Sequence, residues 1–425
     1  MSCRDKADPY KQLWVAALKG EYKEIVAAFG RAGRARKTVE VAGRRFKLPD
    51  MHFLNECIEV LKTIGSDEAA GALLEMAQAN VPWSHQAAEA AAATGKPFVL
   101  DKLYDLSHSK NFPTRQKVAY GLRSSRFRGD ARTIDVLCQL TKDEQREVRA
   151  PALSALGMVA SGSSDGSEKA MRCILSCIDD CDDWVRSEAA CGLGLLCKPD
   201  TFELLVNMLT DESPKVRSAA VRQLGCFGQT DVRQHLLGFV RDENEQTRVS
   251  AAISLSTLAS PEALVALTEM VSDSSVYVRK AIAENLKPGE LQNELILLKL
   301  LKDRSPRVRR QAALALQSTN AAEAKLAITD MLTHPDEEAQ AEGAQALSAE
   351  LFSSEELEHH ISVLAGSSRP TLRRVAALSM LELSFDSRET LLVGLAQDGD
   401  PEVRSAAYRA LYKVNPDRLR EIVSR

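Results

Sequence analysis

Aromatic residues and long apolar runs are both scarce in this sequence. Phe, Trp and Tyr make up 5% of the 425 residues, although apolar residues as a whole reach 44%, so Leu and Ala must supply most of the core. No apolar run approaches the ~18 residues that a membrane-spanning helix needs, and the N-terminal residues lack the apolar stretch of a secretory signal. We therefore expect a cytoplasmic protein that does not insert into membranes.

The signatures of common catalytic and metal sites are also missing. The chain has no glycine-rich phosphate loop, no nucleophile elbow and no zinc-type Cys spacing. Its seven His are scattered, and the pair His359–His360 fits a solvated helix face. Nine Cys at irregular spacing indicate reduced thiols rather than a disulfide framework. We expect no catalytic residues, no metal and no cofactor, and the net charge of −4 argues against a general polyanion binder.

The feature that dominates the sequence is a motif that recurs about every 31 residues. In the copy Asp211–Leu224, an Asp and a short polar gap precede Val-Arg, and Ala and Leu follow three and seven residues after the Arg. The arginines of the copies are Arg149, Arg186, Arg217, Arg248, Arg279, Arg309, Arg373 and Arg404. Gln340 takes the place of one Arg, and a polar insertion, Gly162–Gly166, lengthens the first interval. A fixed period of this length indicates stacked helical repeats.

The residues just before the Arg suit the start of a helix. Capping residues, whose side chains accept hydrogen bonds from the first free N–H groups, stand four positions before the Arg at Asp182, Ser213, Asn244, Ser275, Ser305 and Asp400. Prolines, which cost nothing at the first helical position, follow at Pro214, Pro306, Pro370 and Pro401. The second helices of the repeats should therefore begin near Gln145, Asp183, Pro214, Glu245, Val276, Pro306, Glu337, Pro370 and Pro401.

The Val, Ala and Leu of the motif predict a core stripe, because they fall on one helical face, as Val216, Ala220 and Leu224 do. The Arg is rotated off that stripe, and an Asp stands six residues before it in most copies. We expect the guanidinium to bridge the turn of its own repeat to the acid or carbonyls of the next repeat, which would form a structural ladder. A row of arginines exposed to phosphates is the alternative.

The pattern Asp-x-x-Pro-x-Val-Arg-x-x-Ala-x-x-x-Leu resembles the HEAT-like repeat of the type found in phycobilin lyases and in many bacterial scaffolds. The resemblance implies an all-α, right-handed α-solenoid of about 11 stacked helix pairs, with an N-terminal helical cap. It divides the chain into that cap with its basic segment (1–50), degenerate helical repeats (51–96), a regular HEAT-like array (97–415) and a C-terminal capping helix (416–425). Such repeats serve adaptors, chromophore lyases, an iron hydroxylase and DNA glycosylases, so the fold does not choose the function.

The N-terminal cap combines one predicted helix, at residues 8–29, with a basic segment. Residues 38–48 alternate in polarity around Ala42-Gly43 and can form a small β-hairpin. The segment 31–47 is strongly basic, because its Lys and Arg residues, Arg44 and Arg45 among them, greatly outnumber its single Glu. Two interpretations stay open: a solvated cap over the first repeat, and a docking patch for an acidic partner.

The cysteines Cys173, Cys177 and Cys181 form the most concentrated group of thiols. A spacing of four places the first two on one side of a helix, where thiolates can bind a soft metal. In the repeat register, however, Cys173 and Cys177 replace apolar core residues, and a free Cys in the core behaves as a small hydrophobe. Buried packing is the favoured interpretation.

The leading functional hypothesis is a non-catalytic scaffold or adaptor that binds a partner protein on the concave face of the solenoid. The residues five positions after each Arg vary between copies and are expected on that face, at Arg222, Ile253, Glu284, Leu314, Leu378 and Arg409. A repeated frame with varying positions is how such arrays present different chemistry at each step. The candidate partner-binding residues are Arg44, Arg45, Arg222, Lys280, Glu284, Arg310, Arg374 and Arg409.

Two other functions stay open at this point. A chromophore-lyase-like enzyme or subunit follows only from the resemblance and from the cysteines. A nucleic-acid-binding solenoid would use the stripe Lys280, Arg310 and Arg374, which stand directly after the repeat arginines and can track a phosphate backbone. The sequence does not set the oligomeric state.

Overall fold

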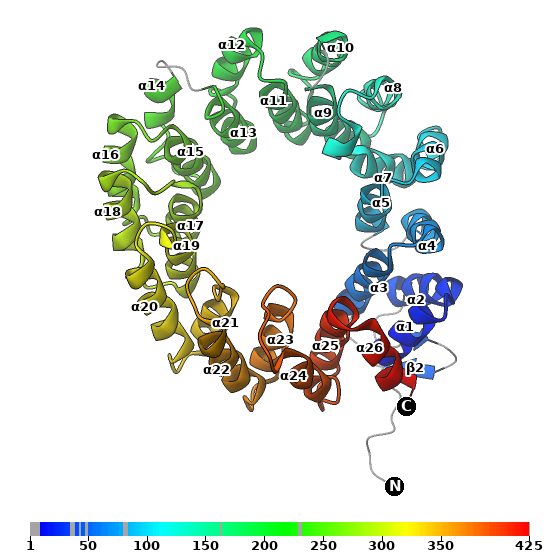
Figure 1. Cartoon of the computed structure of the whole chain (residues 1–425). Coiled ribbons are helices and arrows are strands. Elements are labelled where there is room, and N and C mark those ends of the chain that lie inside the picture. Colours follow the sequence, from blue (N-terminus) through cyan, green and yellow to red (C-terminus); the bar gives the residue numbers. More distant parts are fainter. Residues whose placement is uncertain are drawn as a thin grey trace. The chain divides into compact units, whose positions relative to one another are not determined.

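The protein is an all-α solenoid in which helices follow one another as pairs (Figure 1). The computed structural model describes residues 9–34, 39–41, 44–46, 50–79, 84–161, 164–227 and 232–424. Within these residues, the helices from α4 to α25 make eleven consecutive pairs, which confirms the repeat architecture predicted from the 31-residue motif.

The chain divides into two compact units. The terminal unit contains residues 1–24, 38–47 and 267–425, and the middle unit contains residues 25–37 and 48–266. Two helices cross the boundaries, α2 (Tyr22–Arg34) and α16 (Pro261–Met270). The units do not follow the boundaries predicted from the sequence, because the first residues of the chain group with its last repeats.

The middle unit holds six complete helix pairs. Its elements are α3 (Asp50–Ile64), α4 (Asp67–Gln78), α5 (Ser84–Ala93), α6 (Pro97–Leu106), α7 (Phe112–Leu122), the 3₁₀ helix η2 (Ser125–Phe127), α8 (Ala131–Leu140), α9 (Arg146–Ala160), α10 (Ser164–Leu175), α11 (Asp183–Leu196), α12 (Pro199–Met208), α13 (Pro214–Leu224), α14 (Val232–Leu237) and α15 (Glu245–Leu258). In Figure 1 the first helices α6, α8, α10 and α12 line the outer side of this unit, and the second helices α7, α9, α11 and α13 line its inner side.

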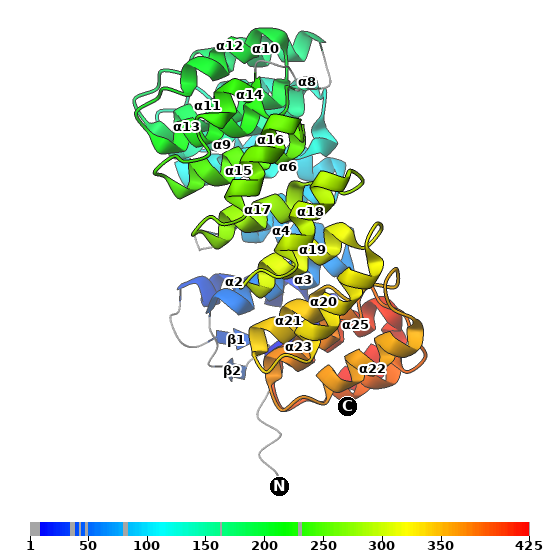
Figure 2. The same cartoon turned by 90° about the vertical axis from the view of Figure 1, so that its left-hand side faces the viewer.

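The terminal unit joins both ends of the chain. Its elements are α1 (Pro9–Leu18), β1 (Val39–Val41), β2 (Arg44–Phe46), α17 (Val276–Asn285), α18 (Leu291–Leu300), α19 (Pro306–Leu316), α20 (Ala321–Leu332), α21 (Glu337–Gln345), α22 (Ser354–Ala365), α23 (Pro370–Ser379), α24 (Arg388–Leu395), α25 (Pro401–Val414) and α26 (Pro416–Ser424). Helices α19 to α23 follow one another in Figure 2 as stacked repeats.

Helix α1 packs against α25 and α26, at the far end of the sequence. Trp14 is fully buried there, and its ring lies 5.5 Å from the ring of Tyr412, centroid to centroid. The neighbouring Leu13 is also fully buried. This contact differs from the prediction, in which the N-terminal segment caps the first repeat.

The repeat motif forms the elements that it predicted. The second helices begin at or within one residue of every expected position, and Pro214, Pro306, Pro370 and Pro401 all stand in the first turn. The stripe Val216, Ala220 and Leu224 is fully buried. Burial of such a stripe removes apolar surface from water and is the main stabilising contribution to each repeat.

The predicted helix caps are only partly present. Side-chain oxygens accept backbone N–H groups at Asp182, Asn244, Ser275 and Asp400. Ser213 and Ser305 make no such bond. The Ser213 hydroxyl instead donates to Asp183 Oδ2 of the preceding repeat at 2.9 Å, and the proline after it has already removed one N–H that would need a cap.

Two local predictions near irregular segments need correction. The helix predicted over residues 8–29 is two helices, separated at Gly20, whose positive φ of 74° is a conformation that glycine adopts without strain. The polar insertion Gly162–Gly166 is helical from Ser164 onward, and residues 162–163 lie outside the described part of the chain. By contrast, the small hairpin suggested for residues 38–48 is present as β1 and β2, with Val39 opposite Phe46.

Candidate partner-binding surface

An arginine ladder joins successive repeats along one edge of the second helices. Arg149 donates from Nε and Nη2 to the carboxylate of Asp180 in the next repeat, at 2.9 and 3.0 Å. Its Nη1 donates to the carbonyl of Asp143 in its own turn at 2.9 Å. Equivalent two-bond rungs join Arg115 to Asp143, Arg186 to Asp211, Arg279 to Asp303 and Arg373 to Asp398.

The other repeat arginines make the same hydrogen bond within their own repeat. The Nη1 atoms of Arg217, Arg248, Arg309 and Arg404 each donate to the carbonyl of the Asp six residues earlier. The carboxylate of Asp242 lies 3.8 Å from Arg217, which makes that rung looser than the others. The guanidinium groups are therefore used within the protein, which leaves little of them for phosphates.

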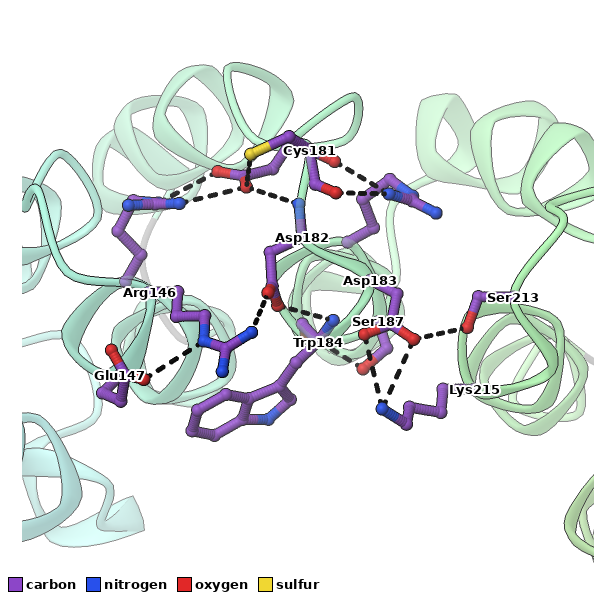
Figure 3. A network of polar contacts seen from close by, with 12 residues as sticks. Arg146, Glu147, Cys181, Asp182, Asp183, Trp184, Ser187, Ser213 and Lys215 are labelled. Carbon is purple, nitrogen blue, oxygen red and sulfur yellow. Dashed lines mark hydrogen bonds and ion pairs between the residues drawn. The ribbon is translucent and has the colours of Figure 1, made fainter.

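A second row of polar contacts links the starts of α9, α11 and α13 (Figure 3). Arg146 Nη1 donates to Asp182 Oδ2 at 2.5 Å, while Asp182 Oδ1 accepts the backbone N–H of Trp184. On the other side, Asp183 accepts from Ser213 and pairs with Lys215 at 3.3 Å. These contacts fix the spacing of three adjacent repeats and hence the surface that their second helices present.

The ladder shifts the pKa of its carboxylates. Hydrogen bonds from Arg186 and from the backbone N–H of Ser213 lower the pKa of Asp211, although burial opposes them. At Asp180 burial is the largest effect and raises the pKa, but the bonds from Arg149 and from backbone outweigh it and the pKa is again lowered. The rungs therefore favour the charged carboxylates in the folded state.

This shift predicts acid sensitivity. A carboxylate whose folded-state pKa lies below its unfolded value of about 3.9 stabilises the fold at higher pH, and the contribution is lost as pH falls through the folded pKa. We expect the melting temperature to drop between about pH 5 and pH 3, and to drop less in Asp211→Asn, which has lost one such group. Thermal melts across this range measure the effect, and identical pH slopes in the two proteins would contradict it.

The basic stripe predicted in the terminal unit is neutralised by acids of the same unit. Lys280 pairs with Glu284 at 3.2 Å, Arg310 with Glu342 at 2.6 Å and Arg374 with Glu402 at 2.9 Å. A phosphate would have to displace a carboxylate at each position. The stripe is thus a poor match for a nucleic-acid backbone, which gains affinity from unpaired cations.

The remaining candidate residues of that unit lie on three different elements. Glu284 is exposed on α17, and Arg409 is half-buried on α25. Arg44 and Arg45 lie on β2, where Arg45 stands opposite Glu40 in the hairpin register. Their side chains fall outside the described part of the structure, so the docking patch suggested for this segment stays a prediction.

The middle unit has a different inner surface, with charges and aromatic rings that face out from its second helices. Arg222 on α13 is exposed, and its side chain has no partner among the described residues. The ring of Tyr120 on α7 lies 5.3 Å from that of His85 on α5. We call this surface the inner patch and define it by His85, Tyr120, Arg123, Glu188 and Arg222.

Electrostatic effects link several members of the inner patch. Burial, and after it the charge of Glu188, raises the pKa of Tyr120, while Arg123 opposes the shift. Burial and Glu188 likewise raise the pKa of Cys191 to about 12, and Arg222 and Arg123 act against them. The charges of Arg123, Glu188 and Arg222 thus all act on the Cys191 region of α11.

Close helix packing explains how these side chains meet. Helix α9 packs between α7 and α11, and its residues there are small and buried, as Ser154 is. A Cβ placed on Gly157 of α9 would lie 2.5 Å from the carbonyl oxygen of Gly192 on α11. Only glycine permits this approach, and the larger side chains of the flanking helices can then reach over α9.

The repeat register contains the signal that sequence reasoning overlooked. Tyr120, Ser154, Cys191 and Arg222 each stand five positions after the ladder Arg of their repeat. Only Arg222 was selected, because the copies that begin at Arg115, Arg149 and Arg186 were not compared at that position. Glu188 and Arg123 lie off this register and became neighbours only through the packing of the helices.

A sequence profile described as HEAT repeats matches residues 100–194, 171–248, 202–287 and 294–356, which is more than half of the chain. The protein belongs to the HEAT repeat family. Its ladder and paired helices are those of a HEAT array. None of the curated proteins matches it significantly.

Solved structures with similar arrays cover much of the chain at low identity. An engineered protein shares 21% identity over 85% of this chain and 99% of its own, with a TM-score of 0.35. The complex of CpcE and CpcF of phycocyanin lyase from Nostoc sp. PCC7120 shares 17% over 60% and 94%, with a TM-score of 0.39. YibA of E. coli shares 20% over 64% and 98%, with a TM-score of 0.40. Similarity at this level carries no inference about function.

The cysteine cluster of this HEAT array does not converge on one point. Cys177 is buried, and its thiol donates to the carbonyl of Thr141 at 3.6 Å, whereas Cys181 is exposed and Cys173 half-buried. A search of the described residues finds no group of three or more His, Cys, Asp or Glu side chains arranged to hold a metal ion. Over the same residues, no helix is both long and apolar enough to cross a bilayer.

Proposed function

We propose that this HEAT protein is a non-catalytic scaffold that binds a partner protein on the inner patch of its middle unit. The observation that carries the proposal is that an exposed, unpartnered Arg222 on α13 and a half-buried Tyr120 on α7 both stand on second helices of this unit. Arg and Tyr are the residue types enriched in protein interfaces and among their energetically dominant positions. Both occupy the variable position of a repeated frame, where an array sets its specificity.

The chemistry of the inner patch favours a protein over a polyanion. Arg123 and Arg222 supply positive charge, Glu188 supplies negative charge, and the rings of His85 and Tyr120 add apolar area. A surface with both signs of charge around aromatic rings complements a folded or extended polypeptide with the opposite arrangement. A phosphate backbone would instead meet repulsion at Glu188.

The rigidity of the frame adds to this support. The ladder and the contacts at the starts of α9, α11 and α13 fix the neighbouring repeats, so the helices that carry the inner patch are held in place before a partner arrives. A surface ordered in advance loses less conformational entropy on binding. The middle unit therefore combines a fixed geometry with variable side chains.

Substitutions on the inner patch should weaken binding of the partner. We expect Arg222→Glu and Tyr120→Ala each to weaken it by roughly 10- to 100-fold, as for dominant interface residues. Affinity capture from the native host, with quantitative mass spectrometry, identifies proteins that bind the wild type and are lost from both variants. Binding constants of the purified pair then measure the change.

Arg172→Glu is the matched control, because Arg172 is also exposed but lies on the first helix α10. It should retain the partner. Circular dichroism verifies that all three variants fold. If every specifically captured protein binds the inner-patch variants as well as it binds the wild type, the interface lies elsewhere.

A further inference from the structure

Two cysteines from neighbouring first helices face each other in the middle unit. Cys138 stands one turn after Asp135 on α8, and Cys173 stands one turn after Lys169 on α10. Lys169 Nζ and Asp135 Oδ1 form an ion pair at 2.5 Å. One turn further along, Cys138 and Cys173 stand at matching positions of these two packed helices, where the Cys138 thiol acts on the pKa of Cys173 as a hydrogen-bond donor. The ion pair and the two thiols thus form consecutive contacts of one helix–helix interface.

The two sulfurs differ in environment. Cys138 is buried at 5% exposure, while Cys173 is half-buried and reachable from solvent. The hydrogen bond from Cys138 lowers the pKa of Cys173 to about 7, against the effect of burial and with help from Lys142, Lys169 and Arg172. The same contact, together with burial, raises the pKa of Cys138. One thiol is therefore partly ionised near neutral pH while its neighbour keeps its proton.

We propose that Cys138 and Cys173 are a redox-active pair that closes to a disulfide between α8 and α10 when the protein meets a hydroperoxide. A partly exposed thiolate among cationic side chains is the environment of reactive cysteines. A protonated thiol in contact with it is placed to resolve the first oxidation product. Since α8 and α10 pack against each other and the Asp135–Lys169 ion pair sets their register, the two side chains are placed to approach to an S–S bond of about 2.05 Å.

The chemistry proceeds in two balanced steps with hydrogen peroxide as the oxidant. The Cys173 thiolate attacks one peroxide oxygen, the O–O bond breaks, and hydroxide leaves, so that Cys173 becomes a sulfenic acid. The Cys138 sulfur then attacks the sulfenic sulfur, the S–O bond breaks, and water leaves with the Cys138 proton. Peroxide gains two electrons and the thiol pair loses two. A thiol reductant restores both cysteines by exchange.

The other described cysteines lack this combination of exposure and activation. Burial raises the pKa of Cys57, Cys177, Cys191 and Cys226. Among the described cysteines, Cys181, Cys197 and Cys226 are exposed. Exposure alone would make those three the first targets, whereas the proposal makes Cys173 the first target and Cys138 its partner.

The disulfide would join two repeats where their spacing is irregular. The polar insertion Gly162–Gly166 ends within the first turn of α10, and α9 and α11 beside it approach each other closely at Gly157 and Gly192. A covalent link between the first helices would hold these repeats at a fixed separation. Oxidation of Cys138 and Cys173 would therefore reduce the flexibility of this part of the array.

The test uses the full-length protein, hydrogen peroxide and a sulfenic-acid probe such as dimedone. Wild type treated with about one equivalent of peroxide should lose two thiols, and peptide mapping should find Cys138 joined to Cys173. Cys138→Ser should stop at the first step and carry dimedone on Cys173. Cys173→Ser should leave Cys138 unoxidised. Cys177→Ser is the matched control on the same helix and should form the disulfide as the wild type does.

A rate measurement separates activation from mere access. Near pH 7 the alkylation of Cys173 should exceed that of Cys226 by roughly tenfold, because a larger fraction is thiolate. Melting curves of the variants establish that they fold. If peroxide joins Cys173 to Cys177 or Cys181, or if Cys173 reacts no faster than Cys226, the proposal is overturned.

Discussion

Replacing Arg279 by alanine should cost more stability than any other single change in the ladder. The side chains of Arg279 and Asp303 are 4% and 7% exposed, and their closest contact is 2.7 Å. Removing the guanidinium leaves a buried carboxylate without its partner, which typically costs about 3 to 5 kcal/mol. We expect a lower urea midpoint and faster hydrogen exchange in α17 and α19, which this rung connects.

Arg307→Ala supplies the matched control for that experiment. Arg307 begins the same helix α19 and pairs with Glu338 at 2.8 Å, but both side chains are 52% exposed. Exposed pairs contribute at most about 1 kcal/mol. Similar losses of stability in Arg279→Ala and Arg307→Ala would show that burial of the rung does not govern its contribution.

Gly157→Ala should be the most disruptive change of a single methyl group. The added Cβ would lie 2.5 Å from the carbonyl oxygen of Gly192 and 2.6 Å from its Cα. These are backbone atoms, which cannot rotate away, so α9 and α11 must separate. Overpacking of this kind costs about 1 to 3 kcal/mol and occasionally more. A lower melting temperature and weaker binding at the inner patch should appear together.

The same substitution elsewhere in the unit should have the opposite sign. Gly71 lies within α4, and a Cβ there would meet nothing within 4 Å. Alanine is a better helix former than glycine by up to about 1 kcal/mol. We therefore expect Gly71→Ala to raise the melting temperature. Destabilisation by both substitutions would mean that the approach of α9 to α11 is not the cause.

The sequence predicted the local structure of each repeat because the relevant interactions repeat with it. Val216, Ala220 and Leu224 form a buried core stripe, and the residues at the same positions of the other copies are buried as well. The surroundings of a residue that differs between copies cannot be predicted from the repeat in this way. Arg310 was expected on the open face, yet it is half-buried and lies against Glu342 of the next repeat. Pairing between residues about 30 positions apart depends on side-chain rotamers that a repeat pattern does not encode.

Convergence at the inner patch was beyond sequence reasoning for a related reason. Tyr120 and Glu188 belong to repeats that are not adjacent, and the influence of one on the other depends on how closely α9 sits between α7 and α11. The glycines that set this distance, Gly157 and Gly192, were not recognised as a facing pair. The sequence shows that they are about one repeat apart, but it does not show whether a glycine serves close helix packing or backbone flexibility.

The contact between α1 and the last repeat has a consequence for the order in which the chain folds. Trp14 meets Tyr412, and about 400 of the 425 residues separate the two in sequence, so this contact has a very high sequence separation. Ribosomes add roughly 5 to 20 residues per second, so α1 waits roughly 20 to 80 seconds before its binding surface exists. Repeats in the middle can form with their neighbours as they emerge, whereas the first helix made is among the last to settle. Until then its apolar face stays exposed, and such surface promotes aggregation during synthesis.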